Sequence, residues 1–337
     1  MNAATHLPDE TLNTVLQHYN IGALVRAWPA ANGIENQNYF VQTHSKQSSA
    51  HGPLEVRQEY VLTVLQQPSY APDHYDPLML TLSAAGLPVA EPLPTTTGER
   101  RSELDGRPAM LQRRLPGSHV FNPTTNQLSA VGRFLGRMHR ACAGAELQLP
   151  NHPRDLSWVN TQAAAIKSYL GYDDQLLLDQ SIESVTSLLG RRDVKSLPQG
   201  TLHADLFRDN VLFNEDGLSG VLDFHHASSG TLMFDLAVTA NDWCTDASGE
   251  LDPDRTLTLL RAYNEIRPLT EQEIWFFSGF ALFAALTFWL SREIVLVPDP
   301  TGQSTPPVRT KNPKEFRNVV EHHLRRTFYI DRRHLQL

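Results

Sequence analysis

The middle of the chain holds polar residues whose types and spacing suit phosphoryl transfer. In the segment 201–227, TLHADLFRDNVLFNEDGLSGVLDFHHA, Asn210 follows Asp205 after four intervening residues, and Asp223 follows a hairpin turn. A phosphoryl transferase needs a carboxylate that orients the attacking hydroxyl and accepts its proton, and oxygen ligands that hold Mg²⁺ on the triphosphate. Asp205 has the chemistry of the first group, and Asn210 and Asp223 have that of the second. The block therefore predicts phosphate transfer from ATP, with Mg²⁺, to a hydroxyl group.

The same block resembles the catalytic and metal-binding loops of protein kinases. His203-Ala-Asp205 stands where those enzymes have His-Arg-Asp, the gap to Asn210 is the same, and Asp223-Phe-His stands where they have Asp-Phe-Gly. The missing glycine and the short loop make the chain more similar to the aminoglycoside phosphotransferase-like kinases, a superfamily that includes choline, methylthioribose and homoserine kinases. An Asp-rich hairpin can also be a simple surface turn, but the three residues in this register make coincidence the weaker explanation.

Short β-type runs alternate with turn signals over the first hundred or so residues, which predicts an antiparallel sheet. Pro77 begins a short helical run that ends at Gly86. The polar segment 44–58 predicts an exposed and mobile hairpin loop. The expected strands are rich in Val, Tyr, Phe and Leu and cover residues 24–30, 38–43, 60–66 and 108–115.

Apolar residues recur at helical spacing after Pro116-Gly117. The change predicts a strand-rich lobe over residues 1–113 and a helix-rich lobe over residues 114–337, which is an α+β organisation. The resemblance implies a protein-kinase-like two-lobed fold, with an ATP cleft between a small antiparallel-sheet lobe and a larger helical lobe. The expected helices of the second lobe cover residues 124–144, 161–171, 174–190, 231–244, 254–266, 271–293 and 313–328.

The resemblance also implies nucleotide contacts in the first lobe. The loop at 31–38, with Gly33 and Asn36, falls where such kinases cover the phosphates with backbone N–H groups. Met110 and Gln112 fall on the strand whose backbone pairs with adenine in such kinases. Taken alone, a glycine between two strands is more often a hairpin turn, and the other two residues suit an ordinary buried strand.

Thr63 occupies the third-strand position at which kinases usually have a lysine for the α- and β-phosphates. Either another basic residue or Mg²⁺ with loop amides replaces that lysine, or the chain is an inactive pseudokinase. In the second type of bacterial homoserine kinase, which shares this fold, a threonine is expected at this position. Three further segments match that family, 234–244, 288–293 and 311–320, whereas 293–310 is atypical of it.

Homoserine carries an ammonium, a carboxylate and a primary hydroxyl group, so its pocket needs an acid and a base in addition to Asp205. Asp242 is the candidate for the ammonium group, and Arg292 is the candidate for the carboxylate. Arg208, within the loop, is a candidate for the carboxylate or for the γ-phosphate. Each has a structural alternative, which is a helix cap or salt bridge for Asp242, a helix-dipole contact for Arg292 and a solvated loop position for Arg208.

Two further residues are expected to support the loop. The resemblance implies that Asp235 braces the backbone of the catalytic loop, and that His203 is a hydrogen-bonded scaffold because Asp205 already suits the role of base. Adjacent histidines at 225–226 and 322–323 suggest a metal site, but neighbouring side chains point in different directions and lack a ligand set. We therefore expect no metal at these histidines.

The composition disfavours several classes of protein. The formal net charge of −8, without clustered Lys and Arg, argues against a nucleic-acid partner. Cys142 and Cys244 form neither a disulfide framework nor a zinc-type spacing, and the N-terminus lacks a secretory signal pattern. The apolar run 274–290 is shorter than the roughly 20 residues that span a bilayer, and Arg292 and Glu293 follow it, so a buried helix is expected. The prediction is a cytoplasmic protein without a membrane or nucleic-acid partner.

The resemblance implies an ATP- and Mg²⁺-dependent kinase that converts L-homoserine to O-phospho-L-homoserine for threonine biosynthesis, with Asp205 as the base. A kinase for another alcohol, such as choline, a sugar or an aminoglycoside, is the alternative within this class. Acceptor charge distinguishes them, because choline favours an aromatic cage and aminoglycosides favour an acidic patch. An inactive nucleotide-binding module is the alternative outside the class. The sequence does not predict an oligomeric state.

Overall fold

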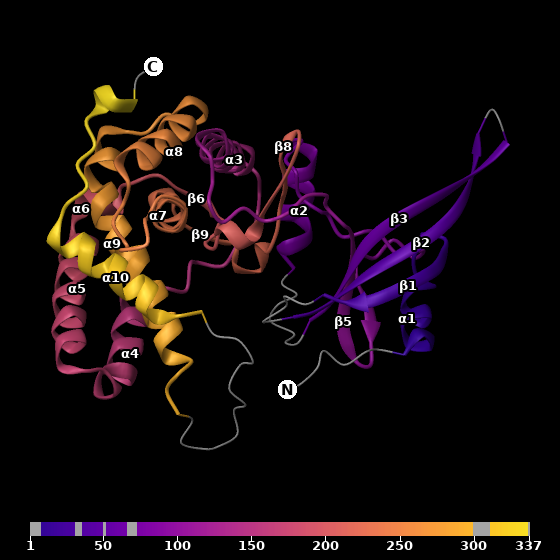
Figure 1. Ribbon diagram of the computed structural model, residues 1–337, viewed down its shortest axis with the longest axis horizontal. Coiled ribbons are helices and arrows are strands. Elements are labelled where there is room, and N and C mark those ends of the chain that lie inside the picture. The colour runs from indigo at the N-terminus through magenta and orange to yellow at the C-terminus, as the bar shows by residue number, and fades with distance from the viewer. Residues whose placement is uncertain (1–7, 31–35, 50–51, 66–72, 299–310, 336–337) are drawn as a thin grey trace. The chain divides into compact units, whose positions relative to one another are not determined.

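Figure 1 shows the computed structural model, which describes residues 8–30, 36–49, 52–65, 73–298 and 311–335. The chain divides into two compact units, Met1–Pro116 and Gly117–Leu337. Each unit has its own buried apolar residues and therefore its own hydrophobic core.

In the described residues of the first unit, five strands form one antiparallel sheet in the order β1-β2-β3-β5-β4. Alternate residues of the central strands, such as Tyr39 and Leu62, are buried because successive side chains of a strand point to opposite faces. Helix α1 packs against this buried face through Leu12. The elements are α1 (Asp9–Leu16), β1 (Ala23–Pro29), β2 (Gln37–Ser49), β3 (Gly52–Val64), α2 (Tyr75–Ala84), β4 (Ser102–Leu104) and β5 (Arg107–Arg113).

Residues 44–49 and 52–58 are strand, so the expectation of a loop over these residues was wrong. Strands β2 and β3 pair from Gln37 opposite Val64 to Ser49 opposite Gly52. The backbone hydrogen bonds of an antiparallel ribbon form between the strands whatever side chains they carry, so a polar composition does not end the pairing. Helix α1 and strand β4 also occur where the sequence patterns predict no element.

Helices make up most of the second unit, and several begin with the capping chemistry expected of them. Thr124 and Thr270 cap α3 and α9 in capping boxes. Helix α4 begins earlier than predicted because the Asp155 side chain accepts a backbone N–H of its first turn. The helices are α3 (Thr125–Cys142), α4 (Leu156–Ile166), α5 (Tyr172–Gly190), α6 (Arg192–Lys195), α7 (Leu232–Trp243), α8 (Pro253–Ile266), α9 (Glu271–Ile294) and α10 (Pro313–Arg325).

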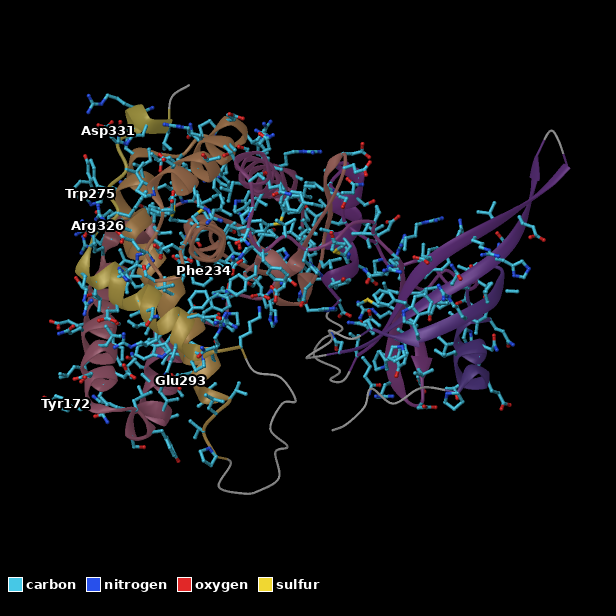
Figure 2. The ribbon with its side chains drawn as sticks, in the orientation of Figure 1. Tyr172, Phe234, Trp275, Glu293, Arg326 and Asp331 are labelled. Carbon is cyan, nitrogen blue, oxygen red and sulfur yellow. The ribbon has the colours of Figure 1, made fainter. Side chains whose placement is uncertain are left out.

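Helix α9 lies at the centre of the second unit, where α4, α5, α7 and α10 pack against it (Figure 1). Among the residues that the structure describes, α9 is the helix long and apolar enough to cross a membrane, but 72% of its most apolar stretch is buried inside the unit. In Figure 2 Phe234 of α7 lies inside this unit, whereas Trp275 at the start of α9 lies on its surface. The prediction of a buried helix over 274–290 is confirmed.

Helices α3 and α8 approach each other closely at two glycines, Gly132 and Gly136. A Cβ atom at Gly132 would lie 2.3 Å from the carbonyl oxygen of Leu259, so a larger residue there would push α8 away. The close contact fixes α3, which carries His139 against α7.

Candidate active site

Asp205, Asn210 and Asp223 lie on loops that connect short strands of the second unit. Asp205 lies between β6 and β7, Asn210 directly precedes β7, and Asp223 follows β8. The side-chain amide of Asn210 donates hydrogen bonds to the carbonyl oxygen of Asp205 at 2.8 Å and to its carboxylate at 3.0 Å. The backbone N–H of Leu222 donates to the carbonyl of Asn210 at 2.9 Å, which ties the end of β8 to the same loop. The strands pair as β6 (Gln199–Leu202) with β9 (Ser228–Thr231) and as β7 (Val211–Asn214) with β8 (Gly217–Val221).

Asp223 has a conformation and an environment that suit a cation ligand. Its φ of +62° is left-handed, a conformation that is uncommon for residues other than glycine and recurs at functional sites. Its carboxylate atom Oδ1 is buried and has no hydrogen-bond partner among the described residues. A buried anionic oxygen without a donor is costly unless a cation approaches it, so this position fits Mg²⁺. Asn210 uses its amide nitrogen on Asp205, so its amide oxygen is the atom suited to a metal.

No cluster of three or more His, Cys, Asp or Glu side chains that could hold a metal occurs in the part of the chain that the structure describes. Mg²⁺ does not need such a cluster in a nucleotide site, because one or two side-chain oxygens act together with phosphate oxygens and water. Asn210 and Asp223 carry side-chain oxygens that fit a ligand set of this smaller kind.

Asp235 of α7 holds the backbone of the loop in place. Its carboxylate accepts the backbone N–H groups of His203 and Ala204, each at 2.8 Å. Ala204 has a φ of +65°, which the surroundings must impose on an alanine. His139 of α3 donates from Nε2 to the same carboxylate at 3.1 Å, and the hydroxyl of Tyr263 on α8 pairs with its Nδ1 at 2.7 Å. A buried chain of contacts from α8 through α3 to α7 therefore fixes the loop.

Asp235 and His203 both support the loop, but Asp235 is favoured in its charged form and His203 in its neutral form. Burial acts to raise the pKa of Asp235, but the contacts with His139 and His203 together outweigh it and hold this pKa below its ordinary value. Burial lowers the pKa of His203, whose Nε2–H donates to the carbonyl of Leu222 at 3.0 Å. Its Nδ1 accepts the backbone N–H of Asp205 at 3.3 Å. A neutral His203 thus links the Asp205 loop to the end of β8.

The carboxyl group of Asp205 has a strongly perturbed pKa. Burial raises the pKa of Asp205 to about 7, and the negative charge of Asp223 adds to the rise. The positive charges of His226, Lys311 and Arg154 act in the opposite direction on this pKa. A carboxyl group that titrates near neutral pH suits general-base chemistry, which is most efficient when the pKa of the base is close to the operating pH.

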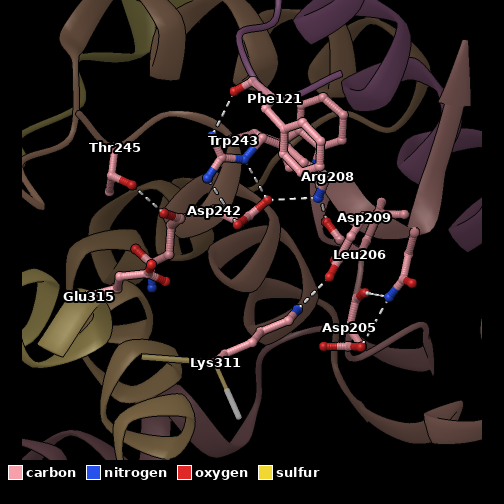
Figure 3. A network of polar contacts seen from close by, with 12 residues as sticks. Phe121, Asp205, Leu206, Arg208, Asp209, Asp242, Trp243, Thr245, Lys311 and Glu315 are labelled. Carbon is pink, nitrogen blue, oxygen red and sulfur yellow. Dashed lines mark hydrogen bonds and ion pairs between the residues drawn. The ribbon is translucent and has the colours of Figure 1, made fainter. Parts of the chain in front are cut away.

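Arg208 and Asp242, both predicted to contact the acceptor, bind each other beside the loop (Figure 3). The Asp242 carboxylate accepts the backbone N–H of Arg208 at 2.7 Å and its Nε–H at 3.1 Å. The Nη1 group of Arg208 donates to the carbonyl of Phe121 at 2.8 Å. The indole N–H of Trp243 donates to the carbonyl of Leu206 at 2.9 Å. The end of α7 therefore supports the loop from a second direction.

Arg292, predicted to bind the acceptor carboxylate, pairs with the start of α10. Its Nη1 group donates to the Glu315 carboxylate at 2.7 Å and to the carbonyl of Asn312 at 2.9 Å. Its guanidinium also lies 4.5 Å from the centre of the Phe316 ring. These contacts join α9 to α10.

Two cations that the sequence analysis did not single out act at the loop. Lys311, just before α10, pairs with Asp209 at 2.7 Å (Figure 3). Arg154, just before α4, acts on Asp205 through its charge. Lys311 begins the segment 311–320, which is the sequence signal that points to it. The sequence holds no comparable signal for Arg154.

The predicted nucleotide contacts belong to the first unit. Gly33 lies outside the described residues, and Asn36 directly precedes β2. Gln112 lies on β5 and donates to the hydroxyl of Tyr75 at 3.3 Å and to the carbonyl of Ala90. Its side chain therefore helps to join α2 and the following segment to the sheet.

Thr63, at the position where kinases usually have a lysine, is buried on β3. Its hydroxyl donates to Oδ1 of Asn38 on β2 at 2.8 Å. It pairs across the sheet with Met110, which is also buried. This position therefore holds a short neutral side chain that is engaged within the sheet.

Sequence comparison defines the class of this protein. Residues 27–269 match the phosphotransferase enzyme family, and the chain belongs to that family. The chain is 39% identical over 295 residues to a homoserine kinase of Pseudomonas aeruginosa (strain UCBPP-PA14). The matched residues make up 87% of this chain and 89% of the relative. It is 35% identical over 324 residues to a homoserine kinase of Methylobacillus flagellatus, and the match covers 96% of this chain and 95% of the relative. Within the phosphotransferase family, the chain groups with the homoserine kinases.

Solved structures share the fold at much lower sequence identity. Amicoumacin kinase, solved with AMP-PNP and Ca²⁺, has a TM-score of 0.66 at 15% identity, covering 95% of this chain and 92% of that chain. A microcompartment-associated aminopropanol kinase has a TM-score of 0.66 at 15% identity, and the match covers 94% of this chain and 95% of that chain. The predicted α+β kinase-like fold is confirmed.

Proposed function

We propose that the chain uses ATP and Mg²⁺ to phosphorylate the hydroxyl group of L-homoserine, which produces O-phospho-L-homoserine. The observation that carries this proposal is the contact between Asn210 and Asp205, a carboxyl group whose pKa is raised to about 7. The homoserine kinases at 39% and 35% identity support this acceptor. The proposal includes a role in threonine biosynthesis. It also includes a location in the cytoplasm, where the thiols of Cys142 and Cys244, which are not joined in a disulfide, would stay reduced.

In the proposed mechanism, Asp205 orients the hydroxyl group and accepts its proton while the oxygen attacks the γ-phosphorus and the bond to ADP breaks. Asn210 fixes the Asp205 carboxylate with its amide nitrogen, and its oxygen would hold Mg²⁺ together with Asp223. Bound Mg²⁺ supplies positive charge for the phosphate oxygens. Asp235 fixes the loop backbone, so Asp205 is already positioned for the hydroxyl group. The rate enhancement therefore comes from positioning and electrostatics rather than from a covalent intermediate.

The roles of the first unit are part of the proposal. Gly33 and Asn36 would cover the phosphates with backbone N–H groups, and the strand with Met110 and Gln112 would pair with adenine. Thr63 is neutral, so the charge that a lysine would supply at its position must come from Mg²⁺, loop amides or another cation.

Asp242, Arg208 and Arg292 remain predicted contacts of the acceptor. Asp242 and Arg208 are bound to each other, and Arg292 is bound by the start of α10. Direct contact with the acceptor would therefore require each of them to exchange a protein partner for the substrate.

A coupled ADP-release assay with Mg·ATP tests the proposal on L-homoserine, L-serine, choline, methylthioribose and kanamycin. We expect turnover on L-homoserine, and a loss of about 10²–10⁴-fold in Asp205→Asn because the base is removed. Asp216→Asn, at the exposed hairpin turn between β7 and β8, is the matched control and should retain the activity. Turnover on another acceptor alone would overturn the substrate but keep the kinase. Binding of Mg·ATP without turnover on any acceptor would indicate an inactive module.

A further inference from the structure

Three buried phenylalanines from three elements form one cluster beside the loop that carries Asp205. Phe207 belongs to the loop itself, Phe288 belongs to α9 and Phe316 belongs to α10. The ring of Phe207 lies 4.7 Å from that of Phe288 and 5.8 Å from that of Phe316, and the last two rings lie 5.4 Å apart. The cluster therefore holds the loop against the two helices.

Each ring of this cluster has a cation over it. The Nζ of Lys311 lies 4.8 Å from the centre of the Phe207 ring, and the guanidinium of Arg154 lies 4.5 Å from that of Phe288. Arg292 lies 4.5 Å from the centre of the Phe316 ring. A cation over an aromatic face is attracted by the ring, and a stacked guanidinium keeps its in-plane N–H groups for other partners. The cluster thus orients three positive charges next to one loop.

Arg292 and Lys311 differ in how available they are to a ligand. Arg292 is 9% exposed and is bound by Glu315 and by a backbone carbonyl, so it joins α9 to α10. Lys311 is 37% exposed, and its partner Asp209 is 42% exposed. An ion pair that is this accessible contributes little to stability, so a substrate anion can replace Asp209 at a small cost. Lys311 is therefore the more available of these two cations.

Lys311 and Arg154 both lie at the loop that carries Asp205. Lys311 pairs with Asp209 and lies over the ring of Phe207 in this loop. Arg154 lies over Phe288, whose ring is 4.7 Å from that of Phe207. The two cations approach from different elements, since Lys311 precedes α10 and Arg154 precedes α4. An acceptor whose hydroxyl group lies at Asp205 would therefore meet positive charge from two sides. Such surroundings attract a carboxylate and repel a polycationic acceptor.

We infer that Lys311 and Arg154 bind the carboxylate of the acceptor and so select an amino-acid alcohol over a purely cationic alcohol. This inference rests on the proposed function and names the anion-binding residues of the same site. It replaces neither Asp205 nor the metal ligands. The segment 201–227 resembles loops shared by the whole superfamily, so it cannot distinguish one acceptor from another. The inference assigns that distinction to two residues outside this segment.

The test compares two acceptors that differ only in the carboxylate, L-homoserine and 3-aminopropan-1-ol. We expect Lys311→Met and Arg154→Gln each to lower kcat/KM for L-homoserine by about 10–100-fold, mainly through KM, because a charge-assisted contact to the carboxylate is lost. For 3-aminopropan-1-ol, followed as a substrate or as a competitive inhibitor, both variants should behave like the wild type. The matched controls are Arg191→Gln, whose guanidinium lies over Phe276, and Lys167→Met, which pairs with Asp179.

The outcomes separate this inference from its alternatives. If the variants weaken both acceptors equally, the two cations bind the γ-phosphate or hold the loop, and the inference is overturned. If Arg292→Gln alone shows the dependence on the carboxylate, Arg292 is the anion-binding residue and the inference is also wrong. Failure of the wild type to phosphorylate L-homoserine would instead overturn the proposed function. Competitive inhibition by L-homoserine and by 3-aminopropan-1-ol, measured against the acceptor that does react, would then decide the role of the two cations.

Discussion

The carboxylate of Asp235 lies 2.8 Å from the backbone nitrogen of Ala204, a residue whose φ is +65°. Such a conformation costs an alanine about 1–3 kcal/mol, so a strong contact has to offset it. A hydrogen bond to a buried carboxylate is of the required strength. Since the next residue is Asp205, this contact sets the direction in which the proposed base leaves the loop.

We expect Asp235→Asn to lower kcat by about 100-fold, with little change in KM, because the amide group would present a donor to the N–H groups of His203 and Ala204. The free energy of unfolding should fall by about 3 kcal/mol, since a buried backbone donor loses its acceptor. Steady-state kinetics and urea unfolding measure the two effects. Asp254→Asn, at an exposed position in the first turn of α8, is the control, and wild-type kcat in Asp235→Asn would refute the bracing role.

The rate should depend on the ionisation of Asp205. Burial raises the pKa of Asp205 to about 7, and only the ionised form can accept a proton, so kcat/KM for ATP should fall about tenfold per pH unit below pH 7 and level off above it. The positive charge of Lys311 lowers this pKa, so the midpoint in Lys311→Met should move to higher pH. Adding ADP directly at each pH checks the coupling enzymes, and a flat profile down to pH 5 would contradict the assignment.

Asp223→Asn should increase the Mg²⁺ concentration needed for half-maximal rate by at least about tenfold, because a metal ligand loses its charge. Its Oδ1 atom is buried and accepts no hydrogen bond from the residues that the structure describes, so the same substitution should leave the Mg²⁺-free protein as stable as the wild type or more stable. A Mg²⁺ titration of the steady-state rate measures the first effect, and thermal unfolding of the Mg²⁺-free protein measures the second. Asp216→Asn is the matched control, and destabilisation of the Mg²⁺-free protein would indicate a structural role instead.

Acid should weaken the second unit through His323, which is buried and pairs through Nε2 with the Asn241 side chain at 2.9 Å. Burial lowers the pKa of His323 to about 4, so below the ordinary value of 6.5 the unfolded chain binds the proton more readily and stability falls as the pH falls from 6.5 toward 4. The loss from this residue between pH 7 and pH 5 is about 2 kcal/mol. Urea unfolding at the two pH values should show a smaller difference in His323→Gln and an unchanged one in the exposed control His18→Gln.

Local signals in the sequence account for most of the helices and for four of the five strands that the structure describes in the first unit, although α1 and β4 carry no such signal. Capping residues and apolar spacing are properties of neighbouring residues, which is why α3 and α9 agree with the pattern. Residues 44–49 and 52–58 show the limit of this reasoning, because their composition is that of a loop while their backbone pairs as two strands. Backbone pairing depends on the partner strand, and composition does not report it.

The sequence by itself determined which polar groups the loop brings together, because the contact between Asp205 and Asn210 joins residues of one short segment. Only the tertiary structure decided what surrounds that loop. Two of the contacts around it join residues that are far apart in the chain. Asp209 pairs with Lys311, and the guanidinium of Arg154 lies over the ring of Phe288. Such contacts follow from how α4 and α10 pack against α9, and the spacing of residues along a sequence does not contain that packing.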